Sequence, residues 1–134
     1  MKVIMLRGPG SCGKTETLNI VYNHLFARSG TSIITPKSQL GKDPRDFETV
    51  LNYGGVKVAI FTMGDFSIYV VNAMQKYSVI ADVLIIACNS KFSRPIAAMN
   101  NYTPHAIVPK TRQPIIAQRP IDDQNAANKI ITSI

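Results

Sequence analysis

Short apolar runs alternate with helix-like segments along the chain, and this alternation restricts the fold more than any other feature. The run at residues 83–88 is the most hydrophobic, and residues 2–6 are nearly all apolar, as in strands buried on both faces of a sheet. Further apolar runs lie at 32–35, 56–63 and 106–108, and helix-like segments lie at 14–28, 44–53, 67–79, 95–100 and 123–133. Strands that alternate with helices usually form a parallel sheet with helices on its faces. We therefore predict an α/β fold, a three-layer αβα sandwich with a central, mostly parallel five-stranded sheet.

Turn and capping residues set the ends of the second predicted helix. Asp43 and Pro44 suit the N-cap and the first position of a helix. We expect this helix to run to about Tyr53 and to stop before the Gly54–Gly55 pair, because glycine commonly follows the end of a helix.

The C-terminal part of the chain gives weaker signals. Residues 109–120 are rich in proline and predict a loop, with an edge strand at 114–117 as an alternative. Either Asp122 or Asp123 is expected to cap a last helix, because a carboxylate can accept hydrogen bonds from the free amides of a first turn.

Length and composition fit one ordinary globular domain spanning residues 1–134. The two cysteines, Cys12 and Cys88, lie in different contexts, and no short Cys or His spacing indicates a zinc site. No apolar run reaches the length that crosses a membrane, and no signal-peptide pattern precedes the first strand. We therefore expect a cytoplasmic protein that makes no membrane contact.

The most specific signal is a glycine-rich motif between the first predicted strand and the first predicted helix. It fits the pattern G-x-x-x-x-G-K-[ST] in full. Its residues are Gly8, Pro9, Gly10, Ser11, Cys12, Gly13, Lys14 and Thr15. Glycines let the backbone approach phosphate oxygens, and amides at a helix N-terminus attract anions. Lys14 is expected to reach the β- and γ-phosphates, and the Thr15 hydroxyl is expected to ligate Mg²⁺.

With this motif the chain resembles a P-loop NTPase, in the subset that includes small nucleoside and nucleotide kinases. The resemblance in pattern covers most of the chain, but only Gly8 to Thr15 is specific. It implies a nucleoside triphosphate at the carboxyl edge of the parallel strands, with ATP and Mg²⁺ as the expected cofactors.

An acidic residue near Mg²⁺ is expected at the end of another core strand. Asp65 follows the run at 56–63 and is our candidate catalytic and metal-binding residue. The alternative is that Asp65 only caps the next helix. Asp82 is a poorer candidate, because it precedes its strand and should lie at the opposite edge of a parallel sheet.

Two patterns that would extend the assignment are missing. Phe66 stands where hydrolytic P-loop proteins often have a water-activating glutamate, which makes fast ATP hydrolysis doubtful. The guanine-reading pattern N-K-x-D is also absent, since Asn89-Ser90-Lys91-Phe92 has the wrong spacing and no acid. ATP is therefore the expected nucleotide.

Phosphoryl transfer also needs positive charge on the departing phosphate. Arg94 follows the fourth predicted strand and is our candidate catalytic arginine, with Arg112 and Arg119 in the proline-rich loop as alternatives. A solvated surface role is the commoner one for any single arginine.

Three functions remain open. The first is a Mg²⁺-dependent phosphotransferase acting on a small-molecule or nucleotide acceptor. The second is a weak ATPase or nucleotide-dependent switch that works through a partner or an oligomer. The third is a nucleic-acid-associated module, which is supported only by the net charge of +7, since no block of five or six basic residues occurs.

Overall fold

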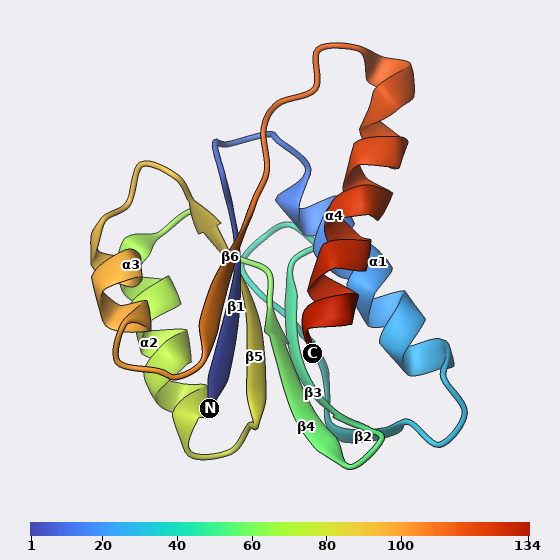
Figure 1. Cartoon of the computed structure of the whole chain (residues 1–134), viewed down its shortest axis with the longest axis vertical. Coiled ribbons are helices and arrows are strands. Elements are labelled where there is room, and N and C mark those ends of the chain that lie inside the picture. Colours follow the sequence, from blue (N-terminus) through green and yellow to red (C-terminus); the bar gives the residue numbers. More distant parts are fainter.

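A six-stranded mixed sheet forms the centre of the protein, in a computed structural model that describes all residues from 1 to 134 (Figure 1). The strand order is β2-β3-β4-β5-β1-β6, in which β4, β5, β1 and β6 run parallel and β2 and β3 are antiparallel. The strands are β1 (Lys2–Gly8), β2 (Ser32–Gln39), β3 (Phe47–Tyr53), β4 (Val56–Phe61), β5 (Val83–Asn89) and β6 (His105–Pro109).

Helices cover both faces of this sheet, so the chain is an α/β protein whose layers are compatible with an αβα sandwich (Figure 1). One face carries α1 and α4, and the other carries α2 and α3. The helices are α1 (Lys14–Ala27), α2 (Ser67–Ser78), α3 (Arg94–Met99) and α4 (Arg119–Ser133), with a short 3₁₀ turn at Ile116–Gln118. None of these helices combines the length and the apolar character that crossing a membrane requires.

Two apolar cores lie on the two faces of the sheet, because successive side chains of a strand point in opposite directions. In β1, Ile4 packs in the core under α1 and α4, which includes Leu18. Its neighbour Met5 packs in the core under α2 and α3, which includes Met74. The central strands are thus buried on both sides, as their continuous apolar runs predicted.

The predicted helix at 44–53 is wrong, because residues 47–53 form strand β3. Phe47 and Leu51 pack in the core under α1 and α4, whereas Val50 packs in the core under α2 and α3, so side chains alternate between the two faces as in a strand. Gly54 and Gly55 both have positive φ, at 59° and 87°, and close a tight hairpin between β3 and β4. Two consecutive residues with positive φ are typical of a two-residue hairpin turn. The glycine pair therefore follows a strand and does not end a helix.

This hairpin also changes the predicted sheet from five mostly parallel strands to six mixed ones. The expected strand at 32–35 extends to Gln39 and pairs with β3 in antiparallel fashion. Pro36 is tolerated within it because β2 is the edge strand, where a missing amide need not break a ladder. The strands expected at 2–6, 56–63, 83–88 and 106–108 are confirmed.

The predicted start of the last helix is also wrong. Helix α4 begins at Arg119, with Pro120 in its first turn, so neither Asp122 nor Asp123 caps it. Asp122 accepts a hydrogen bond from Gln113, and Asp123 pairs with a buried lysine. The alternative edge strand at 114–117 is not formed, whereas the helices expected at 14–28, 67–79 and 95–100 are confirmed.

Candidate functional site

A cleft of about 480 Å³ lies at the carboxyl ends of the parallel strands. Its lining comes from the start of α1, from the segment between β2 and β3, from the turn after β4 and from the segment between β6 and α4. Only one of its 16 lining residues is hydrophobic. A lining of this kind suits a charged or strongly polar ligand better than an apolar one.

The Gly8–Thr15 loop forms one wall of the cleft and closes around its own lysine. Lys14 is buried, and its Nζ donates hydrogen bonds to the carbonyl oxygens of Gly8 at 3.0 Å and Pro9 at 2.7 Å. Gly13 has a φ of 93° and precedes α1, which begins without a side-chain cap. The first-turn amides of α1 therefore have no side-chain acceptor of their own, and an anion can take that place.

Lys110, which the sequence did not single out, braces this loop from behind. Its Nζ donates to the carbonyl oxygen of Cys12 at 2.7 Å and pairs with Asp123 of α4 at 2.7 Å, and both side chains are almost fully buried. A Cβ on Gly13 would lie 2.5 Å from the Asp123 carboxylate, so only glycine lets α4 approach this closely. The ion pair thus fixes the loop against α4.

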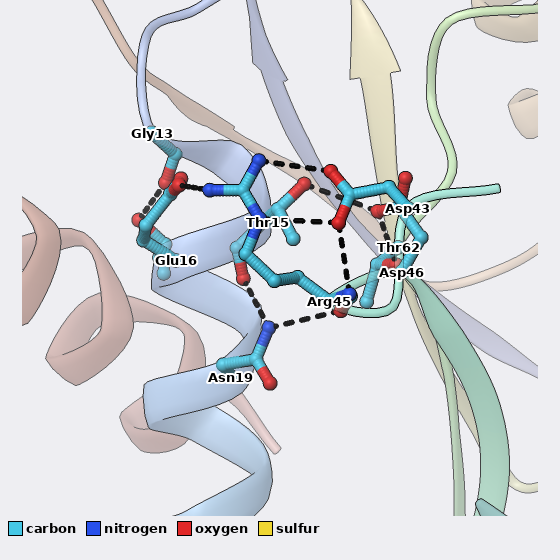
Figure 2. A network of polar contacts seen from close by, with 9 residues as sticks. Gly13, Thr15, Glu16, Asn19, Asp43, Arg45, Asp46 and Thr62 are labelled. Atoms are coloured by element: carbon cyan, nitrogen blue, oxygen red, sulfur yellow. Dashed lines mark hydrogen bonds and ion pairs between the residues drawn. The ribbon is translucent and has the colours of Figure 1, made fainter. Parts of the chain in front are cut away.

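Asp46 is the second site residue that sequence reasoning missed. Its Oδ1 accepts hydrogen bonds from the Thr15 hydroxyl at 3.1 Å and from the Thr62 hydroxyl at 2.8 Å (Figure 2). Thr62 follows β4 and also accepts a hydrogen bond from the Phe47 amide, which ties the start of β3 to the end of β4. Recognising the β3–β4 hairpin in the sequence would have pointed to Asp46, because the residue then directly precedes a strand next to β4. A helix at 44–53 would have placed it elsewhere.

Asp65 lies in the same cleft, but it has no hydrogen bond to Thr15. Its side chain is exposed, and the residue before α2 is Phe66, with no side-chain cap. The alternative that Asp65 serves as the helix cap is therefore not realised. Gly64 brings Asp65 to the cleft by crossing close to β5, where its carbonyl oxygen accepts a hydrogen bond from the Asn89 amide at 3.0 Å.

The three candidate arginines lie at different distances from the cleft. Arg94 is exposed at the first position of α3 and is not among the lining residues. Arg112 donates from Nε to the carbonyl oxygen of Gly10 at 2.8 Å, and so contacts the glycine-rich loop directly. Arg119 lines the cleft and donates to the carbonyl oxygen of Gln113 at 2.9 Å. A catalytic role of Arg94 stays a prediction.

A fourth arginine, Arg45, lies in the cleft beside Thr15 (Figure 2). Its Nη1 contacts Glu16 at 2.7 Å, and its Nη2 contacts Asp43 at 2.8 Å. Hydrogen bonds from Arg45 hold the pKa of the Asp43 carboxyl below its usual value, so this carboxyl stays ionised at neutral pH. The guanidinium thus bridges α1 and the β2–β3 segment across one side of the cleft.

Nowhere are three or more His, Cys, Asp or Glu side chains grouped to hold a metal ion. Within the cleft the Asp46 carboxylate meets two hydroxyl oxygens, those of Thr15 at 3.1 Å and Thr62 at 2.8 Å. No family model, curated protein or solved structure matches the chain.

Because Gly64 passes close to the backbone of β5, we predict that a larger residue at this position destabilises the fold. Gly64→Ala should lower the free energy of unfolding by about 1–3 kcal/mol, because the added Cβ would lie 2.7 Å from the Ala87 carbonyl oxygen and 2.8 Å from the Cys88 nitrogen. Denaturant unfolding measures the loss. Gly10→Ala is the matched control, since its Cβ would meet only Asn89 Nδ2 at 3.9 Å. Equal stability of the two variants would contradict the prediction.

Proposed function

We propose that the chain binds ATP with Mg²⁺ in this cleft and transfers the γ-phosphate to an acceptor hydroxyl. The observation that carries the proposal is the Gly8–Thr15 loop, which wraps a buried lysine and leads into an uncapped helix at the cleft. A mostly polar cleft of about 480 Å³ next to this loop offers room for a polyphosphate group.

The phosphate chain would replace contacts that the loop now makes with itself. Lys14 Nζ would leave the carbonyl oxygens of Gly8 and Pro9 and donate to the β- and γ-phosphates. The first-turn amides of α1 would donate to the same phosphates at the positive end of the helix dipole. Lys110 would keep the loop in place meanwhile, because its contacts are with Cys12 and Asp123 and not with the ligand.

Thr15 and Asp46 are the residues suited to hold Mg²⁺. A hydroxyl and a carboxylate oxygen already meet there at 3.1 Å, and both are hard oxygen ligands of the kind that this ion takes together with phosphate oxygens. When bound, Mg²⁺ supplies positive charge against the β- and γ-phosphate oxygens. Asp46 therefore takes the metal-side role that the sequence analysis gave to Asp65.

Asp65 suits a different part of the reaction. Asp65 is an exposed residue of the cleft lining with no hydrogen bond to the Thr15–Asp46 pair, so its carboxylate is available to accept the proton of an acceptor hydroxyl. The acceptor oxygen then bonds to the γ-phosphorus while the bond to the β-phosphate oxygen breaks, and ADP leaves. Neither Asp46 nor Asp65 is followed by a water-activating glutamate, since the next residues are Phe47 and Phe66, and this supports transfer over hydrolysis.

The proposal is tested by calorimetric titration with ATP and by ADP production with a panel of nucleosides, nucleotides and 5′-hydroxyl oligonucleotides. Binding together with acceptor-dependent ADP release supports the phosphotransferase. Acceptor-independent ADP release supports the weak ATPase or switch instead. Retention on DNA or RNA that falls steeply with salt supports the nucleic-acid-associated module. If the chain does not bind ATP, both the phosphotransferase and the ATPase or switch are refuted.

Asp46→Asn should remove most of the gain in ATP affinity that Mg²⁺ provides, on the order of tenfold, because the amide loses the negative charge. The amide oxygen can still accept hydrogen bonds from the Thr15 and Thr62 hydroxyls, so the fold should persist. The measurement is ATP affinity with Mg²⁺ and with EDTA. Asp65→Asn is the comparison: if only that variant loses the Mg²⁺ dependence, the assignment of Asp46 is refuted.

A further inference from the structure

The cations of the cleft differ in how firmly they are held. Lys110 is locked in a buried ion pair with Asp123, and Lys14 is buried among loop carbonyls. Arg45 has only exposed partners, since its side chain is 62% exposed and that of Glu16 is 46% exposed. The contact with Asp43 is bidentate, through Nε at 3.1 Å and Nη2 at 2.8 Å, but solvent reaches these groups, so the guanidinium is held less firmly than Lys110 in its buried pair.

The backbone of Arg45, in contrast, is fixed next to the first turn of α1. Asn19 Nδ2 donates to the carbonyl oxygens of both Thr15, at 2.9 Å, and Arg45, at 3.2 Å. The next residue, Asp46, accepts the hydrogen bond from the Thr15 hydroxyl. A solvent-exposed guanidinium is thus carried on an anchored backbone, immediately beside the group proposed to hold Mg²⁺ (Figure 2).

We infer that Arg45 is a ligand of the nucleotide phosphates, and that Glu16 and Asp43 hold its guanidinium only while the cleft has no nucleotide. The inference rests on the proposed function. A phosphate offers the same paired oxygen acceptors as a carboxylate and carries more charge, so it can replace both partners with charge-assisted hydrogen bonds. Arg112 and Arg119 each donate Nε to a single backbone carbonyl oxygen, so neither has the paired carboxylate acceptors that a phosphate could replace.

The test is ATP affinity in the presence of Mg²⁺, measured by calorimetry for three single variants. Arg45→Ala should weaken binding about tenfold or more, because a charge-assisted contact to phosphate is lost. Glu16→Gln and Asp43→Asn should each strengthen binding by about two- to fivefold, because they remove a competitor for the guanidinium. If the bridge only tied the β2–β3 segment to α1, all three variants would weaken binding. The direction of the change therefore separates the two roles.

Neutralising a carboxylate also removes its electrostatic repulsion of the phosphates, which strengthens binding without any release of Arg45. A double variant separates the two effects. In Arg45→Ala/Asp43→Asn, the gain from Asp43→Asn should be reduced, since no guanidinium remains to be released. An equal gain in both backgrounds would overturn the inference. Arg28→Ala is the matched control, because Arg28 lies after α1 over the Tyr53 ring and outside the cleft.

Failure of the inference and failure of the proposed function give different results. If the unsubstituted chain binds ATP and Arg45→Ala binds it equally well, only the role of Arg45 is overturned. If the unsubstituted chain binds no ATP, the proposed function is overturned, and the inference with it.

Discussion

Replacing Lys14 by alanine is expected to lower ATP affinity by about 100-fold or more while the domain stays folded. The estimate follows from the loss of charge-assisted contacts to two phosphates, each worth about 1.5–3 kcal/mol. Stability should change little by comparison, because Lys14 Nζ contacts two carbonyl oxygens and the Cys12 sulfur of its own loop and has no carboxylate partner. Calorimetric titration measures the affinity, and circular dichroism with thermal unfolding checks the fold.

Lys91→Ala serves as the control for this experiment, because Lys91 is exposed in the loop after β5 and is not among the cleft residues. Its ATP affinity should equal that of the unsubstituted chain. An unchanged ATP affinity in a folded Lys14→Ala variant would refute the central claim that the Gly8–Thr15 loop binds phosphate.

Replacing Lys110 by methionine is expected to lower the free energy of unfolding by about 3–5 kcal/mol, because breaking a buried ion pair leaves one charge uncompensated. The Asp123 carboxylate would remain buried without its partner, and the Cys12 carbonyl oxygen would lose its donor. Denaturant unfolding gives the free energy. The same variant should also bind ATP less tightly, because the loop loses its brace against α4.

Two further variants show whether the buried pair is the cause. Lys110→Met combined with Asp123→Leu should recover much of the lost stability, since an apolar pair of similar volume avoids the uncompensated charge. Lys76→Met breaks the pair with Glu48, in which the lysine is exposed, and should cost no more than about 1 kcal/mol. If Lys110→Met costs as little as Lys76→Met, the buried pair does not support the loop.

The sequence predicted the parallel part of the fold well, because its signals have few competing interpretations. Strands β1 and β5 are buried on both faces, and their continuous apolar runs reflect that burial directly. The loop between β1 and α1 matches the pattern G-x-x-x-x-G-K-[ST], which fixes the residue type at four of its eight positions. The position of the Gly8–Thr15 loop at the cleft therefore followed from the sequence.

The antiparallel hairpin could not be predicted in the same way, because the residues at its two ends are equally common at the ends of helices and of strands. Asp43 and Pro44 begin turns as readily as helices, and a glycine pair ends either element. Residues 47–51 form a strand with Phe47 and Leu51 in one core and Val50 in the other, and this two-sided packing depends on the pairing of β3 with β4.

The error in the fold also misplaced part of the site. Asp46 approaches Thr15 only because β3 begins directly after it and is tied to Thr62. With residues 44–53 taken as a helix, Asp65 was the remaining acid after a core strand. Lys110 and Arg45 carried no local signal at all, since their roles depend on contacts with residues 98 and 29 positions away in the chain.

The exposure of β2 gives the two walls of the cleft different local stabilities. Every residue of β2 is exposed, and its pairing with β3 is irregular, with register shifts between Ile33 and Thr35 and between Thr35 and Ser38. Residues 40–44 continue directly from this strand, and the segment is tied to α1 and to the end of β4 only where it reaches Arg45 and Asp46. The opposite wall continues from the fully buried core of β1. Local opening at the sheet edge needs less free energy than opening at the core. Opening at the β2 edge should therefore loosen residues 40–44 before it disturbs the Gly8–Thr15 wall of the cleft.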